Sequence, residues 1–402
     1  MIDLPALPGI RALEEEMIAL RRHLHAHPEL SFEEFATADL VAGKLQAWGY
    51  QVHRGLGGTG VVGLLRRGNS GKTIGLRADM DALPIIEQTG LPYSSRHEGV
   101  MHACGHDGHT AMLLAAARYL VESCEFDGSL VVIFQPAEEG DGGARRMLED
   151  GLFELFPCDA VFAMHNMPGL PVGKLGFLAG PFMASTDTVS IRVDGVGGHG
   201  AMPHKAVDPV LAGSAIVMAL QSIVSRNVAP LDTAVVTVGA FHAGIAANVI
   251  PDHAELQLSV RALKTQVRDE LIARITAVAE AQAASFGARA TVTVDEAQRF
   301  PALFNHPEST EFARQVALDW VGEQGLIPNM QPLTGSEDFA VMLERCPGCY
   351  LLIGNGDGEG EGEGEGEGEG GCMVHNPGYD FNDDCLATGA SYWVRLVEAF
   401  LA

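Results

Sequence analysis

Basic residues are scarce in this chain of 402 residues, which has 26 Lys and Arg against 52 Asp and Glu and a formal net charge of −26. Nucleic-acid binding needs a basic surface, so the charge balance argues against DNA or RNA as a partner. An anionic membrane surface is disfavoured for the same reason. The 47% hydrophobic content is nevertheless typical of a globular protein.

The sequence also has few cysteines and no long hydrophobic run. Seven cysteines are an odd number and too sparse for a disulfide framework. The N-terminus carries Asp3 and the acidic run 14–16 where a secretion signal would have a basic start and an apolar stretch. The uncharged run 209–225 contains Gly, Ser and Gln, which favours an amphipathic helix over a membrane span. We therefore expect a cytoplasmic protein that does not enter membranes.

A low-complexity tract accounts for part of the negative charge. Residues 357–371 contain Asp357 and six Gly-spaced Glu residues, which contribute 7 of the 26 net negative charges and leave −19 for the rest. Alternating Gly and Glu has no apolar face and repels itself, so we expect a flexible, solvated loop with no metal-binding role.

The order of the expected elements predicts an α/β domain with an inserted α+β domain. Apolar strand-like runs alternate with helical patterns up to about residue 184, which is typical of a covered parallel sheet. Between 185 and 297 the expected order becomes β-α-β-β-α-β, that of a compact ferredoxin-like unit. The α/β pattern then resumes over 298–402. The first domain is therefore expected to be discontinuous, with parts at 1–184 and 298–402.

Most of the residues suited to chemistry fall in four short clusters, 77–84, 102–109, 135–140 and 163–166, and His375 stands alone after the acidic tract. Three of the clusters follow expected strands. Because ligands of open α/β sheets bind beyond the carboxyl ends of the strands, the clusters could converge there.

The residue types in these clusters indicate a metal site. Zn²⁺ takes Cys, His and carboxylate ligands, and Mn²⁺, Co²⁺ and Ni²⁺ share part of this preference. The candidates are Cys104, His106, Glu139 and His165. Cys104 and His106 are two residues apart, so an extended segment would point both to one side. Each histidine alone would more often be an ordinary surface residue, and it is the clustering that favours a metal.

Two further features suggest catalysis. In the pair Glu138-Glu139, one carboxylate can bind a metal while the other accepts a proton from a water whose pKa the metal lowers. On an exposed surface the same pair would simply be solvated. In the Gly-rich stretch 195–204, His199 could donate to a developing oxyanion, although an incidental histidine in a Gly-rich turn fits the spacing equally well.

Together these stretches resemble the aminoacylase/hippurate-hydrolase branch of the dinuclear metallopeptidases, whose members hydrolyse hippurate, N-acetyl amino acids and indole-acetyl amino-acid conjugates. The similarity runs through nearly the whole chain in order, at 22–29, 76–84, 101–109, 134–139, 197–204, 248–251, 335–339 and 375–381.

The resemblance implies a role for each matching position. Two divalent metal ions per subunit (Zn, Mn, Co or Ni) would be bound by Cys104, His106, Glu139, His165 and His375. Glu138 would be the general base, and His199 would stabilise the tetrahedral intermediate, often across a dimer interface. Asn248 and Arg261 fall where relatives contact the substrate. Asp79 and Asp81 would support the metal ligands. Asp79 occupies the position at which related peptidases carry a metal-ligand histidine.

The resemblance also implies a catalytic α/β domain with an inserted lid that forms a homodimer or a higher homo-oligomer. The expected reaction is hydrolysis of an N-acyl amino acid to a carboxylic acid and a free amino acid. Two alternatives remain open: a dipeptidase or carboxypeptidase with the same chemistry, and a metal-binding protein without catalysis. The residues leave undecided the acyl group, the metal, and which ligand the two metals share.

Overall fold

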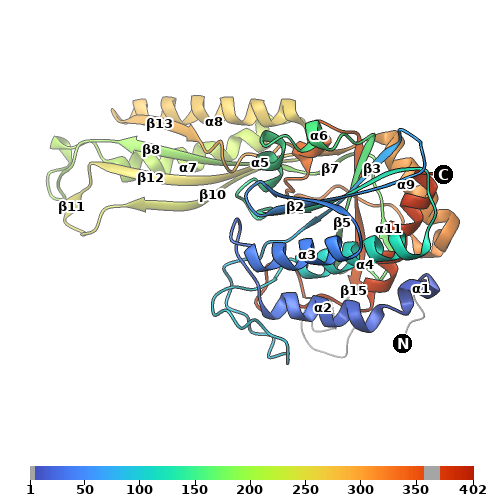
Figure 1. Cartoon of the computed structure of the whole chain (residues 1–402). Helices are drawn as coiled ribbons and strands as arrows, with labels where there is room; N and C mark the ends of the chain where they lie inside the picture. The colour runs from blue at the N-terminus through green and yellow to red at the C-terminus, as the bar shows by residue number, and fades with distance from the viewer. Residues whose placement is uncertain (1–4, 357–371) are drawn as a thin grey trace. The chain divides into compact units, whose positions relative to one another are not determined.

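The computed structural model describes residues 5–356 and 372–402 (Figure 1). The chain forms two compact units. Unit 1 contains 1–180, 304–331 and 341–402, and unit 2 contains 181–303 and 332–340. The acidic tract 357–371, and with it the expected solvated loop, lies outside the described residues.

Unit 1 is built on a seven-stranded sheet with the strand order β1-β2-β4-β3-β5-β15-β6. Its parallel centre consists of β4, β3, β5 and β15, while β1, β2 and β6 pair antiparallel at the edges. Every residue of β4 and β15 is buried, as expected of parallel strands covered on both faces. The predicted α/β fold is confirmed. The strands are β1 (Gln51–Leu56), β2 (Gly60–Arg67), β3 (Thr73–Asp79), β4 (Gly128–Gln135), β5 (Ala160–Pro168), β6 (Leu175–Gly176) and β15 (Gly348–Gly356).

Helix α4 is the central helix of this unit and contacts α2, α11 and β3. Its residues Ala111–Leu114 are fully buried, and Met112 lies so close to α11 that a Cβ on Gly389 would be 2.1 Å from its sulfur. The α-helices that lie wholly in this unit are α1 (Pro8–Arg11), α2 (Glu14–Ala26), α3 (Phe35–Ala47), α4 (His106–Ser123), α5 (Gly143–Glu149), α6 (Leu152–Leu155), α9 (Pro307–Val321) and α11 (Cys385–Phe400), and the short α10 (Ala340–Leu343) begins at its boundary.

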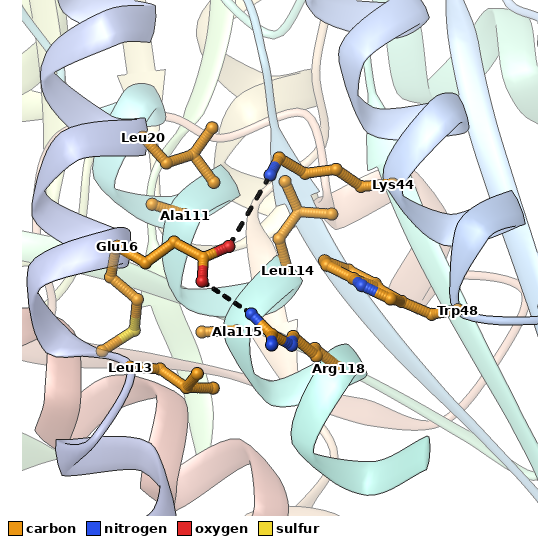
Figure 2. Close-up of a pocket in the computed structure, with 10 residues that line it drawn as sticks. Leu13, Glu16, Leu20, Lys44, Trp48, Ala111, Leu114, Ala115 and Arg118 are labelled. Atoms are coloured by element: carbon orange, nitrogen blue, oxygen red, sulfur yellow. Dashed lines mark hydrogen bonds and ion pairs between the residues drawn. The ribbon is translucent and has the colours of Figure 1, made fainter. Parts of the chain in front are cut away.

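A small pocket lies between α2, α3 and α4, lined by leucine, alanine and tryptophan side chains (Figure 2). Its charged groups pair with one another, because Glu16 lies 2.6 Å from Arg118 and 4.0 Å from Lys44. The pocket is therefore a packing feature of the three helices, in which the charges that face it are already satisfied.

Unit 2 is an α+β unit with a four-stranded antiparallel sheet in the order β10-β12-β8-β13. Along the chain it reads β8, α7, β10, β12, α8, β13, the β-α-β-β-α-β order of a ferredoxin-like unit. Side chains of β12 alternate between buried and more exposed positions, and the buried ones pack against α7 and α8. The elements are β8 (Ser185–Asp194), α7 (Pro209–Arg226), β10 (Ala234–Ala243), β12 (His253–Ala262), α8 (Thr265–Ser285) and β13 (Arg289–Val294).

Helix α7 corresponds to the uncharged run noted in the sequence. Its length and composition alone would allow it to cross a membrane. One face of the helix, with Ile216, Leu220 and Ile223, is fully buried in the core of unit 2. The opposite face exposes Leu211 and Met218. Packing of one face thus accounts for part of its apolar composition.

Candidate metal centre

The chemically active clusters of unit 1 follow three neighbouring parallel strands. Strand β3 ends at Asp79, β4 ends at Gln135 shortly before Glu138 and Glu139, and β5 carries His165. The three strands lie in the order β4-β3-β5, so their carboxyl ends share one edge of the sheet. This edge is where an open α/β sheet binds its ligands.

At this edge the structure brings the five candidate metal ligands into two groups that share one sulfur. Cys104, His106 and His165 form the first group, and Cys104, Glu139 and His375 form the second. Within each group the donor atoms lie within 4.8 Å of one another. Cys104 Sγ is 3.3 Å from His165 Nε2, and His375 Nε2 is 3.3 Å from Glu139 Oε1. The thiol thus lies where it can serve both groups.

The orientation of two imidazoles suits metal binding. His106 Nδ1 donates to the Asp81 carbonyl oxygen at 2.8 Å, and His165 Nδ1 donates to the Asn166 carbonyl oxygen at 2.6 Å. When neutral, each ring in this orientation has its lone pair on Nε2, which is how histidine ligands are usually held. In the described part of the chain, His106 Nε2 and Glu139 Oε1 are buried and make no hydrogen bond. Buried polar atoms rarely lack a partner, so these atoms fit a divalent metal ion.

Local backbone geometry differs from the sequence expectation here. Cys104 and His106 were expected in one extended segment, but His106 is the first residue of α4. The turn between them depends on Gly105, which has φ 90°. A Cβ at this glycine would lie 2.3 Å from Asn166 Oδ1 and 2.6 Å from Tyr379 Oη. The helix start, rather than a strand, therefore brings the two donors together.

The charges around the site favour a cation. Burial opposes a charge on His106, but Asp79, Asp81 and Glu139 together raise its pKa to about 10. Burial and the nearby carboxylates, Glu139 first among them, raise the pKa of the Cys104 thiol well above its usual value. Without a metal the site therefore holds protons on these groups, and a bound metal would replace them.

Glu138 and Glu139 follow β4, as the sequence suggested, and lie in a turn. Ala137, the residue before them, has the left-handed φ of 52°. Both carboxylates reach His106, with which they form a further group of possible donors. The two neighbouring side chains can therefore act on the same centre.

Asp79 and Asp81 support other groups of the site. Asp79 Oδ1 is 2.6 Å from His109 Nδ1, and its Oδ2 accepts from Arg77 at 2.5 Å. Asp81 Oδ2 accepts the backbone N–H of Glu139 at 3.0 Å. His109, for which the sequence predicts no role, has both ring nitrogens hydrogen-bonded, since its Nδ1 contacts Asp79 and its Nε2 contacts Asn166. Its position three residues after His106 on one helix was the available signal.

His199 and Asn248 belong to unit 2 and lie on neighbouring segments. His199 is in β9 (Gly198–His199), which pairs with β11 (Val249–Ile250). The carbonyl oxygen of Asn248 accepts the N–H of Gly200 at 2.8 Å. His199 is exposed, and its Nδ1 accepts the backbone N–H of Ala201 at 3.0 Å. The neutral ring must therefore carry its proton on Nε2.

Arg261 is the other candidate in unit 2 and lies on β12. Its Nη1 donates to Ser336 Oγ at 2.9 Å, and partial burial lowers the pKa of its guanidinium. In the described part of the chain it forms no ion pair. A partly buried arginine without a carboxylate partner can bind an anionic group.

Comparison with known proteins shows the family to which the chain belongs. Residues 75–399 match the family model for peptidase family M20/M25/M40. The chain is 47% identical over 399 residues to hippurate hydrolase of Campylobacter jejuni, covering 98% of this chain and 99% of that one. It is 42% identical over 347 residues to N-acetyl-L-cysteine deacetylase of Bacillus subtilis, covering 86% and 82%. Its fold matches that of the B. subtilis YXEP protein, a dinuclear metal binding peptidase from the M20 family, with TM-score 0.80, 33% identity and coverage of 97% and 99%.

Proposed function

Because the chain belongs to peptidase family M20/M25/M40, we propose that it is a metal-dependent amidohydrolase that cleaves N-acyl amino acids to a carboxylic acid and a free amino acid. The observation that carries the proposal is the pair of donor groups joined by Cys104 at the carboxyl edge of the sheet. Similarity to a hippurate hydrolase and to an N-acetylcysteine deacetylase supports the substrate class. This agrees with the reaction expected from the sequence.

The metals proposed are two divalent ions of Zn, Mn, Co or Ni. His106 and His165 would hold one, Glu139 and His375 the other, and Cys104 both. When bound, such ions polarise an amide carbonyl and lower the pKa of a water molecule.

Glu138 is proposed as the general base. It lies beside Glu139 in the same turn and within the donor group that contains His106. A carboxylate there can accept the proton of the attacking water and then deliver it to the leaving amine nitrogen.

Unit 2 is proposed to supply substrate contacts as a lid domain spanning about 185–297. His199 would donate its Nε2 proton to the developing oxyanion. This proton is free for that purpose because the hydrogen bond from Ala201 occupies Nδ1. Arg261 would bind the carboxylate of the amino-acid portion, with Asn248 as a further contact. The donation by His199 could occur within one chain or across a homodimer formed through the lid. We also propose a cytoplasmic location.

A substrate panel tests the proposal. The apoprotein is loaded separately with Zn²⁺, Mn²⁺, Co²⁺ or Ni²⁺ and assayed with N-benzoylglycine, N-acetyl amino acids and dipeptides. We expect metal-dependent release of amino acids from the acylated substrates. Turnover of dipeptides alone would identify a dipeptidase, and metal-loaded protein inactive on every substrate would leave only a metal-binding role.

A further inference from the structure

Glu34 is a buried carboxylate far in sequence from the metal centre, yet it binds the turn that carries Glu138 and Glu139. Its side chain is 0% exposed. Oε1 accepts the backbone N–H of Ala137 at 2.9 Å and that of Phe32 at 3.0 Å, and Oε2 accepts the Thr59 hydroxyl. Glu34 therefore connects its own loop and Thr59 to the end of β4.

Both backbone amides that Glu34 Oε1 binds belong to residues in the left-handed region. Ala137 has φ 52° and Phe32 has φ 62°. For a residue with a Cβ this conformation is strained, and it persists only where the surroundings hold it. The carbonyl oxygen of Ala137 also accepts the N–H of Gly143 at 2.9 Å. Ala137 is thus held through both its N–H and its carbonyl group.

The conformation of Ala137 sets the direction of the two residues that follow. Relaxation to an ordinary φ near −60° would turn the chain after the Ala137 N–Cα bond by roughly 110°. Glu138 and Glu139 could not then keep their places near His106. The left-handed turn is therefore a requirement of the site, not an incidental feature of the loop.

A second contact from the same loop leads to Glu139. Ser31 donates to Asp81 Oδ2 at 2.9 Å, and this oxygen also accepts the N–H of Glu139 at 3.0 Å. Residues 31–34 therefore hold the turn at Ala137 directly and at Glu139 through Asp81. Of the two contacts, the one from Glu34 acts on the strained residue.

We propose that Glu34 is a positioning residue that holds Ala137 in its left-handed conformation and thereby orients Glu138 for proton transfer and Glu139 for metal binding. The part concerning Glu138 rests on the proposed function. The part concerning Glu139 rests on the donor groups and can be measured without turnover.

The ionisation of Glu34 is not required for this role. Burial, together with the charge of Asp81, raises the pKa of Glu34 to about 7. Oε1 can accept hydrogen bonds in either protonation state, so an amide oxygen should replace it. A glutamine should therefore preserve the contact, while alanine should remove it and aspartate should be one methylene too short to reach Ala137.

The experiment compares Glu34→Ala, Glu34→Asp and Glu34→Gln with Glu29→Ala as the matched control. Glu29 lies in the same segment, but its carboxylate accepts the N–H groups of Ala36 and Thr37 at the start of α3. The readouts are kcat and KM for N-benzoylglycine, Mn²⁺ affinity by calorimetry, and thermal unfolding. Glu34→Ala and Glu34→Asp should lower kcat and Mn²⁺ affinity about 10- to 100-fold, as loss of a supporting group typically does. Glu34→Gln should stay within a few-fold of wild type.

The control separates positioning from stability. Glu29→Ala should lower the unfolding temperature while kcat and Mn²⁺ affinity remain near wild type. If Glu34→Ala does not fold, Glu34→Asp decides the question, since it retains a buried carboxylate. Wild-type kcat and Mn²⁺ affinity in a folded Glu34→Ala or Glu34→Asp variant would overturn the proposal, as would equal losses in Glu34→Gln. Wild-type protein inactive on N-benzoylglycine and on N-acetyl amino acids, with Mn²⁺ affinity still lowered by Glu34→Asp, would refute the proposed function and leave the positioning role standing.

Discussion

Replacing Cys104 by alanine should remove both metal ions, whereas replacing one histidine should remove only one. The two donor groups share Cys104, while His165 belongs to one and His375 to the other. Cys104→Ala therefore leaves two protein donors in each group, and His165→Ala leaves the second group complete. Loss of a supporting residue alone weakens metal binding 10- to 100-fold, so loss of a ligand should cost about 100-fold or more at each affected ion.

Metal content after dialysis against buffered Mn²⁺, measured by mass spectrometry, tests this directly. We expect about two ions per chain in the wild type, about one in His165→Ala and in His375→Ala, and fewer than one in Cys104→Ala. Cys124→Ala is the control, because Cys124 is also buried but ends α4 far along the helix from His106. Two ions retained by Cys104→Ala, or a loss no larger than that of His165→Ala, would refute the shared-sulfur arrangement.

Three further outcomes follow from the geometry. Arg261→Ala should raise KM for N-benzoylglycine about 10- to 100-fold, the usual loss for a charge-assisted hydrogen bond. The KM for an analogue that lacks the carboxylate should not change. Burial opposes the charge on His25, but hydrogen bonds to Asp107 and Glu87 raise its pKa from 6.5 to about 9. Its stabilising effect is therefore complete below pH 6.5 and is lost as the pH rises through 9. In urea unfolding of the metal-free protein, the stability advantage over His25→Asn should fall by about 3 kcal/mol between pH 6 and pH 9, and an advantage that grows with pH would contradict this reasoning. Gly143→Ala would place a Cβ 1.7 Å from the Pro136 carbonyl oxygen and should lower both activity and unfolding temperature, whereas Gly71→Ala, with open space around it, should change neither.

The sequence predicted the fold well where periodicity and burial agree. Residues 130–135 form one of the apolar runs that predicted a covered parallel sheet, and β4 is buried throughout. Short edge elements escaped prediction. Strand β1 was missed because its side chains are mostly exposed and show no regular alternation. Neighbouring strands, rather than local propensity, decide such elements.

The candidate site was predictable in composition but not in conformation. The residue types and their order identified Cys104, Glu138 and Glu139, but not the backbone conformation of the two segments that carry them. Gly105 and Ala137 adopt left-handed backbone angles. The alanine gives no sequence signal for this, because the restraint comes from Glu34, which lies 103 residues away in the sequence. The shared position of Cys104 likewise depends on tertiary packing.

Metal-dependent hydrolysis with Glu138 as the general base can be tested by a single comparison. Glycine release from N-benzoylglycine is measured for metal-loaded wild type and Glu138→Gln, with metal content determined on the same samples. We expect metal-dependent release by the wild type and a rate lower by about 100- to 10,000-fold in the variant at unchanged metal content. Near-wild-type turnover by a fully metal-loaded Glu138→Gln protein would contradict it.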